Sequence, residues 1–122
     1  MKTILLVDDD SNIRRLLSFL LERTGSKVFT AVDGEEGLQR ARELKPQLVI
    51  TDAMMPKMDG FQLCTALRND PELAHVKIIM LTASDQTSLD ESASAHGANL
   101  CLIKPFNPIE ITRIVKEMMA DQ

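Results

Sequence analysis

The stretch Ile4-Leu5-Leu6-Val7-Asp8-Asp9-Asp10 joins a short apolar run to three acids, and related patterns occur twice further along the chain. Leu48-Val49-Ile50-Thr51 ends at Asp52, and Leu100-Cys101-Leu102-Ile103 ends at Lys104. Short, nearly continuous apolar runs are typical of strands buried on both faces of a parallel sheet. Parallel strands have their carboxyl ends at one edge, so the pattern predicts that these charges converge where open α/β sheets bind ligands.

Between these runs, helix signals alternate with further strand signals. Apolar residues in the first helix follow the i, i+3, i+4, i+7 spacing of a one-sided helix. Strands are expected over residues 3–7, 27–31, 47–51, 76–81 and 100–103; helices are expected from the N-cap Ser11 to Gly25, from Asp33-Gly34 to Pro46, over residues 61–68 and 86–96, and from the N-cap Asn107 onward. Right-handed crossovers then favour an α/β, doubly wound, five-stranded parallel sheet, for which the flavodoxin-like order 2-1-3-4-5 is one common solution.

Size and composition indicate one domain spanning residues 1–122. The chain has 14 basic and 18 acidic residues, a net charge of −4, and no basic stripe, which argues against direct nucleic-acid binding. Its apolar runs are too short for a membrane span or a signal peptide. Cys64 and Cys101 lack C-x-x-C spacing, so we expect reduced, buried thiols in a cytoplasmic protein.

The carboxylates of Asp8, Asp9 and Asp52 would repel one another at such an edge. Each like-charged pair about 4 Å apart costs roughly 4 kcal/mol at an effective dielectric of about 20, so the cluster is expected to bind a cation. Carboxylate oxygens suit Mg²⁺, or Mn²⁺ in its place. Asp52 is the best nucleophile for an acyl phosphate because it stands alone at its strand end, whereas Asp8 and Asp9 can hold the metal. Lys104 would pair with phosphoryl oxygens and Thr82 would offer a hydroxyl.

Each of these residues also has an ordinary explanation when taken singly. Acids favour helix N-termini, as at Asp8 and its neighbours, and Asp52 could open an Asx turn. Lys104 could be a solvated surface lysine, and Thr82 an ordinary strand residue. Their occurrence together at four strand ends favours a built site.

Four sequence blocks resemble the receiver domain of two-component response regulators. They are Leu6-Val7-Asp8-Asp9-Asp10, Ile50-Thr51-Asp52-Ala53-Met54-Met55-Pro56-Lys57-Met58-Asp59-Gly60, Leu81-Thr82-Ala83 and Lys104-Pro105-Phe106. The resemblance implies a CheY-like (βα)5 fold in which Asp52 accepts a phosphoryl group from a phosphohistidine of a histidine kinase or phosphotransfer protein. It further implies that Asp9, Asp52 and the backbone carbonyl of Met54 hold Mg²⁺, that Asp8 supports the ion through water, and that Lys104 contacts the phosphoryl group.

The resemblance also implies how the signal leaves the site. Thr82 would move toward the phosphoryl group and couple it to the face formed by the fourth helix, the fifth strand and the fifth helix, where a downstream protein docks. Many receivers carry Tyr or Phe where this chain has Cys101, so we expect backbone shifts in place of an aromatic rotamer switch. Met54 and Ser84 flank the path of the hydrolytic water in this family, and their side chains predict a persistent acyl phosphate. The chain is then a signalling phosphoacceptor and not an enzyme.

Alternative functions remain at this stage. A phosphohydrolase of the haloacid dehalogenase type would use Asp8 as nucleophile and Asp10 as general acid, but Asn12 departs from its motif and no cap segment is present. A receiver-like module that is never phosphorylated conflicts with the complete set of acids, Thr82 and Lys104. A flavin or nucleotide binder would need a glycine-rich phosphate loop. The Met1 start and short tail favour a stand-alone receiver, with a receiver cut from a longer protein as the alternative.

Overall fold

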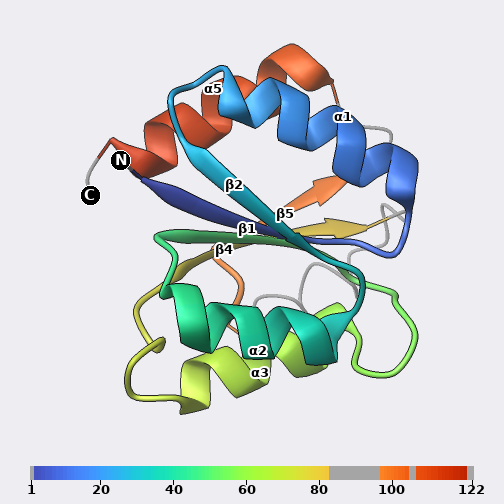
Figure 1. The fold of residues 1–122 in the computed structure, drawn as a ribbon, viewed down its shortest axis with the longest axis vertical. Coiled ribbons are helices and arrows are strands. Elements are labelled where there is room, and N and C mark those ends of the chain that lie inside the picture. The colour runs from blue at the N-terminus through green and yellow to red at the C-terminus, as the bar shows by residue number, and fades with distance from the viewer. Residues whose placement is uncertain (1, 83–96, 105–106, 121–122) are drawn as a thin grey trace.

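Five parallel strands form one sheet in the computed structural model, which describes residues 2–82, 97–104 and 107–120 (Figure 1). The strand order is β2-β1-β3-β4-β5, as the sequence predicts. Their bounds are β1 Thr3–Val7, β2 Lys27–Ala31, β3 Leu48–Asp52, β4 Lys77–Thr82 and β5 Leu100–Ile103. Every neighbouring pair is parallel, so all five strands end at the same side of the sheet, here called the carboxyl edge.

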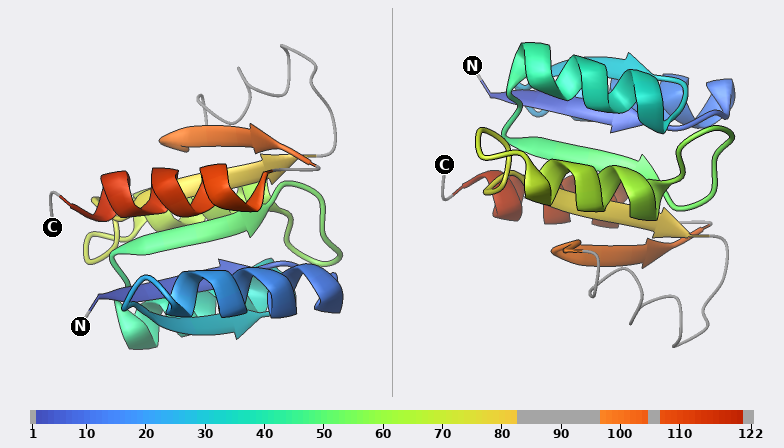
Figure 2. Two further views of the ribbon diagram at one scale, coloured as in Figure 1. Left: turned by 90° about the horizontal axis from the view of Figure 1, so that it is seen from above. Right: turned by 90° about the horizontal axis from the view of Figure 1, so that it is seen from below.

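Helices cover both faces of the sheet. Their bounds are α1 Ser11–Glu22, α2 Gly34–Leu44, α3 Gly60–Asn69 and α5 Pro108–Met119. Helices α1 and α5 lie on one face and α2 and α3 on the other (Figures 1 and 2). The helix expected over residues 86–96 lies outside the described residues. No described helix is long and apolar enough to cross a membrane.

Strand side chains point alternately into two apolar cores. In β1, Leu5 and Val7 belong to the core under α2 and α3, whereas Ile4 and Leu6 belong to the core under α1 and α5. All four side chains are fully buried. This burial on both faces explains why the strands appear in the sequence as continuous apolar runs instead of alternating ones.

Side-chain caps set where the helices begin, and one differs from its prediction. Asn107 caps α5 as expected, and Asp33 caps α2 at the predicted helix start. The cap of α1, however, is Asp10 and not Ser11: an Asp10 carboxylate oxygen accepts from the backbone N–H of Asn12 at 2.8 Å. An aspartate caps as well as a serine, and its charge also suits the helix dipole, so the helix begins one residue earlier. One of the three consecutive acids is thereby used by the helix.

The opposite side of the sheet, here called the amino edge, is held by side chains that donate to backbone carbonyls. The Arg68 guanidinium donates to the carbonyls of Gly97, Ala74 and Val76 and to the Asn99 side chain at 2.5 to 3.0 Å. The same Asn99 oxygen accepts from the backbone N–H of Ile78. Arg68 therefore joins the end of α3, the loop before β4 and the turn before β5.

Two lysines at the amino edge fix the end of α5. Lys77 donates from its ammonium to the carbonyl of Met118 at 2.5 Å, and Lys2 donates to the carbonyl of Met119. Carbonyls in the last turn of a helix lack intrahelical partners and carry partial negative charge, so cations stabilise them.

Candidate functional site

The carboxyl edge brings together the charged residues that follow the apolar runs. Asp8 and Asp9 follow β1, Asp52 ends β3, and Lys104 follows β5. One carboxylate oxygen from each of Asp8, Asp9 and Asp52 lies within 4.8 Å of the other two. The convergence expected from the strand ends is therefore present in the structure.

Asp8 is the most constrained acid of this cluster. Its side chain is fully buried, one carboxylate oxygen accepts from the backbone N–H of Asp10 at 2.9 Å, and the other lies 3.1 Å from the Lys104 ammonium. Its backbone is also fixed, because its N–H donates to Ala31 and its carbonyl accepts from Arg14. The protein thus orients both Asp8 oxygens, whereas Asp9 is exposed.

The Lys104 ammonium lies between two carboxylates. It is 3.1 Å from Asp8 and 3.3 Å from Asp52, and its side chain is 20% exposed. The expectation that Asp52 stands without a side-chain partner is therefore wrong. Two carboxylates at the edge of a buried sheet need a compensating charge, and β5 ends where the lysine reaches both. Burial lowers the pKa of Lys104, but the charges of Asp52 and Asp8 raise it by more, so the pKa lies above its ordinary value.

Asp52 binds protons more tightly than an ordinary aspartate. Burial is the main cause of its raised pKa and the charge of Asp8 the second, whereas Lys104 and a hydrogen bond from the Met54 backbone act in the opposite direction. Its side chain is 13% exposed, so the carboxylate keeps an opening to solvent. Added positive charge near Asp52 would therefore stabilise its ionised form.

Backbone hydrogen bonds fix the start of the loop that follows β3. Ala53 donates its N–H to the carbonyl of Leu81 at 2.7 Å, and its own carbonyl accepts from Gly60 at 2.9 Å. A Cβ added at Gly60 would overlap the carbonyl oxygen of Asp52, and one added at Gly34 would overlap that of Met58. The sequence predicts a loop at Gly60 and a helix start at Gly34, but its pattern does not indicate that both glycines allow two backbone segments to touch.

The residues expected to take part in switching, or to set the lifetime of an acyl phosphate, differ in their exposure to solvent. Thr82 ends β4 and is 3% exposed, and the Met54 side chain is 67% exposed. Cys64 is buried as expected, and burial raises the pKa of its thiol to about 11. Cys101 is only partly buried, in contrast to the expectation, because β5 is the edge strand of the sheet. Ser84, like the helix expected over residues 86–96, lies outside the described residues.

The donor atoms of the acidic cluster fit a hard divalent cation. Asp8, Asp9 and Asp52 offer only carboxylate oxygens, and Mg²⁺ prefers oxygen ligands and retains part of its water. The ammonium of Lys104 lies beside both Asp8 and Asp52, and its single positive charge compensates only part of the negative charge of the three carboxylates. The cluster can therefore hold Mg²⁺ together with part of its water.

Comparison with known proteins agrees with the fold and this site. A family model described as "Response regulator receiver domain" matches residues 4–116. The alkaline phosphatase synthesis transcriptional regulatory protein PhoP of Bacillus subtilis is 42% identical over 118 residues, which cover 97% of this chain and 48% of that protein. Protein PilG of Pseudomonas aeruginosa is 31% identical over 93% of this chain and 84% of that protein. The chain spans about half the length of the first curated relatives it matches.

Solved structures give the same result. The chemotaxis protein CheY4 of Vibrio cholerae superposes with a TM-score of 0.92 and 34% identity, covering 98% of this chain and 99% of that one. Similarity at this level extends over the whole described fold and is not limited to the acidic motif.

Proposed function

The chain belongs to the response regulator receiver domain family, and from that premise we propose that Asp52 accepts a phosphoryl group from a phosphohistidine of a histidine kinase or phosphotransfer protein. The observation that carries the proposal is the position of the Asp52 carboxylate. It lies within 4.8 Å of two further acids and 3.3 Å from the Lys104 ammonium, and it remains open to solvent. No other described carboxylate of the cluster combines these three properties.

In the proposed reaction, one Asp52 oxygen attacks phosphorus, the bond from phosphorus to the imidazole nitrogen breaks, and the imidazole keeps the electron pair. The product is an acyl phosphate on Asp52. Lys104 releases the Asp52 carboxylate and contacts a phosphoryl oxygen, while it keeps its ion pair with Asp8. Thr82, at the end of the neighbouring strand, supplies a hydroxyl to the phosphoryl group.

Receiver domains bind Mg²⁺ at an acidic pocket, and the proposal assigns the ligands in this chain. Asp9, Asp52 and the backbone carbonyl of Met54 would hold Mg²⁺ or Mn²⁺, with Asp8 supporting the ion through water. The two partners already made by Asp8 support this indirect role. When bound, the ion supplies positive charge for the phosphoryl oxygens.

The signal then leaves through β5, because Lys104 contacts the site through its ammonium and directly follows β5 in the chain. Its backbone N–H donates to the carbonyl of Thr82 at 2.6 Å, directly after β5 ends. A changed position of Lys104 therefore moves the end of β5 relative to β4. With Cys101 in the strand, the output is a backbone shift on the face that includes β5 and α5, where a downstream protein would dock. Phosphorylation without any change in the β5 amide signals would contradict this part of the proposal.

The proposal also treats residues 1–122 as a single domain that acts as a signalling phosphoacceptor without independent enzymatic turnover. It places the protein in the cytoplasm, which agrees with its two free cysteines. Receiver domains interact with histidine kinases or phosphotransfer proteins. The hydrolase alternative loses support, because its nucleophile Asp8 is buried with both oxygens engaged and its general acid Asp10 caps α1.

The test is phosphorylation by a small phosphodonor with Mg²⁺, followed by intact-mass measurement. Wild type is expected to gain one phosphoryl group and Asp52→Asn to gain none. Asp8→Asn is expected to be phosphorylated more slowly, because it loses an acid of the metal cluster but keeps the acceptor. Donor turnover that survives Asp52→Asn but is abolished by Asp8→Asn would contradict the proposal and support the hydrolase.

Lifetime is tested on the same phosphoprotein. The exposed, apolar side chain of Met54 should hinder the hydrolytic water, so the acyl phosphate is expected to persist. Met54→Asn, which offers a polar group at this position, should accelerate its loss. Equal decay rates in wild type and Met54→Asn would refute this role of Met54.

A further inference from the structure

Asp9 differs from the other two acids of the cluster in how its position is set. Its side chain is exposed and, within residues 2–82, 97–104 and 107–120, makes no hydrogen bond or ion pair. Asp8, by contrast, has both carboxylate oxygens engaged, and Asp52 lies beside Lys104. One oxygen of Asp9 nevertheless lies within 4.8 Å of an oxygen from each of the other two acids. The position of Asp9 therefore depends on its backbone.

Both peptide groups that flank Asp9 are held by a side chain. The group after it carries the N–H of Asp10, which donates to a carboxylate oxygen of Asp8 at 2.9 Å. The group before it carries the carbonyl of Asp8, which accepts from Nη1 of Arg14 at 2.7 Å. Hydrogen bonds from a charged donor are about twice as strong as neutral ones. Since only the φ and ψ angles of Asp9 separate these two planar groups, holding both fixes the direction of its Cβ.

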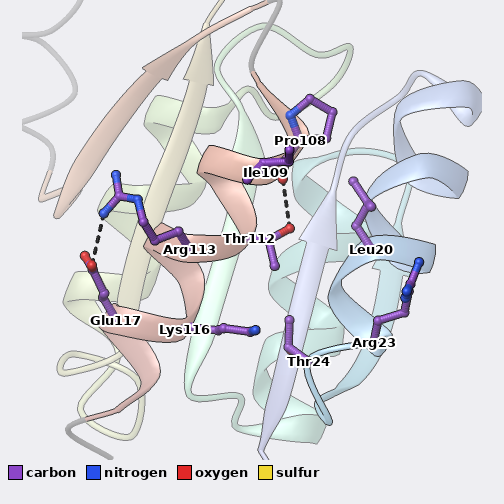
Figure 3. Close-up of a pocket in the computed structure, with 9 residues that line it drawn as sticks. All are labelled: Leu20, Arg23, Thr24, Pro108, Ile109, Thr112, Arg113, Lys116 and Glu117. Atoms are coloured by element: carbon purple, nitrogen blue, oxygen red, sulfur yellow. Dashed lines mark hydrogen bonds and ion pairs between the residues drawn. The ribbon is translucent and has the colours of Figure 1, made fainter.

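Helix α1 holds Arg14 in place for this contact. The backbone N–H of Arg14 donates to the carbonyl of Asp10 at 3.1 Å, and Leu17, about one turn later, is fully buried. The pocket of about 540 Å³ between α1 and α5 lies elsewhere, because Leu20 and Arg23, which contribute to its lining, lie at the far end of this helix (Figure 3). Arg14 is thus anchored beside the acidic cluster and lies outside that pocket.

The guanidinium of Arg14 binds a carbonyl and not a carboxylate, although that carbonyl belongs to an acid of the cluster. Among the described residues, no carboxylate lies within ion-pair distance of Arg14. A cation paired with Asp9 would compete with a metal ion for that carboxylate. By binding the carbonyl of Asp8, Arg14 supports Asp9 and leaves its oxygens available.

We infer from these contacts that Arg14 is a positioning residue for Mg²⁺, which acts through the carbonyl of Asp8 to hold the Asp9 carboxylate within reach of the ion. The inference rests on the proposed function, in which Asp9 is a metal ligand. The sign of the effect separates positioning from charge. If Arg14 acted by its charge alone, its removal would strengthen the binding of a cation, because like charges repel. If Arg14 positions Asp9, its removal weakens that binding.

The test is Mg²⁺ affinity, measured by titration calorimetry on the full chain without a phosphodonor. Arg14→Met should weaken Mg²⁺ binding by about tenfold, the lower end of the range for residues that orient a metal ligand. The matched control is Arg15→Met, which removes the same charge from an exposed neighbour that has no hydrogen bond or ion pair within the described part of the chain. Its affinity should not fall. In the metal-free protein, the amide shifts of Asp9 and Asp10 should move in Arg14→Met and stay in place in Arg15→Met.

Phosphorylation by a small phosphodonor adds a second measurement. In Arg14→Met, the Mg²⁺ concentration that gives half the maximal rate should rise by about tenfold, the same factor as the affinity loss. The rate at saturating Mg²⁺ should stay within about twofold of wild type, because Asp52 and Lys104 are unchanged. Arg14→Lys keeps a charged donor on a shorter side chain, so its affinity should lie between those of wild type and Arg14→Met.

Magnesium binding by Arg14→Met that is as tight as that of wild type, or tighter, would overturn the inference, as would equal losses in Arg14→Met and Arg15→Met. If Arg14→Met does not fold, the decision rests on Arg14→Lys, where unchanged affinity with unchanged Asp9 amide shifts would also overturn it. A wild-type protein that shows the Arg14 dependence of Mg²⁺ binding but gains no phosphoryl group would instead overturn the proposed function and leave this inference standing.

Discussion

The carboxyl and amino edges of the sheet use their charges in opposite ways. At the carboxyl edge, three carboxylates lie close together, two of them share the ammonium of Lys104, and the pKa of Asp52 is raised. At the amino edge, the cations of Arg68, Lys2 and Lys77 each donate to backbone carbonyls. The carboxylates at the carboxyl edge therefore carry more negative charge than Lys104 neutralises, whereas each of the three cations at the amino edge is hydrogen-bonded to backbone.

The contacts at the amino edge stabilise the fold, whereas the crowded carboxylates at the carboxyl edge form the candidate functional site. Unbalanced carboxylates lower stability but attract a cation and a phosphate. The hydrogen bonds at the amino edge keep the strands in register, so a movement of Lys104 at the carboxyl edge need not disturb the turn before β5. The predictions below change one edge at a time.

The largest expected effect is at the amino edge. Arg68→Met removes the donors to three backbone carbonyls and to Asn99, so the free energy of unfolding should fall by about 3 kcal/mol in urea titrations. The control is Arg42→Met, whose exposed ion pair with Asp70 should contribute less than about 0.5 kcal/mol. Similar losses in the two variants would show that the Arg68 contacts do not hold this edge.

A smaller loss is expected for Lys104→Met, which leaves Asp8 and Asp52 without their shared cation. The free energy of unfolding at pH 7 without divalent ions should fall by about 2 kcal/mol, and Mg²⁺ should restore part of it. The raised pKa of Lys104 fixes the sign: its contribution is complete below the ordinary value of 10.5 and is lost as pH rises through the higher folded value. An unchanged urea midpoint at pH 7 would show that the carboxylates need no compensation.

Asp52→Asn should change stability in the opposite direction. Because burial and Asp8 disfavour the ionised form of Asp52, the variant is expected to be about 1 kcal/mol more stable at pH 7 without divalent ions. Lys104 keeps Asp8 as its partner in this variant.

The pH dependence provides the check on Asp52→Asn. A raised folded pKa means that Asp52 is least costly to stability below its ordinary value of 3.8 and most costly above its folded pKa. The gap in melting temperature between variant and wild type should therefore narrow as pH falls from 7 toward 4. A gap that widens on acidification would reverse the proposed electrostatics of the carboxyl edge.

The smallest effect is expected for Lys57→Met, at a second ion pair near the carboxyl edge. Lys57 lies 3.8 Å from Asp33 and is 64% exposed, so its loss should lower the free energy of unfolding by less than about 0.5 kcal/mol. Mg²⁺ affinity, measured by titration calorimetry, should stay the same. A marked loss of affinity would mean that the crowded site extends to Lys57.

Most of the fold could be predicted because burial determines the apolar pattern. The bounds of β1, β2 and β5 agree with the predicted ranges, whereas β3 and β4 each begin and end one residue later than predicted, so that they end at the polar residues Asp52 and Thr82. The apolar pattern predicts that each of these strands ends with its apolar run. The backbone pairing continues past it, since ladder hydrogen bonds do not depend on side-chain polarity.

The sequence predicts which charged residues converge at the carboxyl edge, but not which of them contact one another. Topology alone brings Asp8, Asp52 and Lys104 to one edge, but the length and direction of the lysine side chain decide which acids it contacts. The Arg68 contacts were missed because they join a helix end to backbone carbonyls as distant in sequence as Gly97, and no periodicity encodes such pairs. The cap at Asp10 was missed because two adjacent residues had nearly equal capping preference.

The tight approach of Gly60 to the carbonyl of Asp52, and of Gly34 to Met58, bears on how this site tolerates mutation and on how it could be transplanted. Neither glycine carries any reactive group, yet one added methyl group at either position would displace the loop that follows Asp52. A saturation library should therefore reject substitutions at these two positions as strictly as at the aspartates. A designer grafting the acidic residues onto another sheet would need both clearances as well, because they belong to the site as much as its charges do.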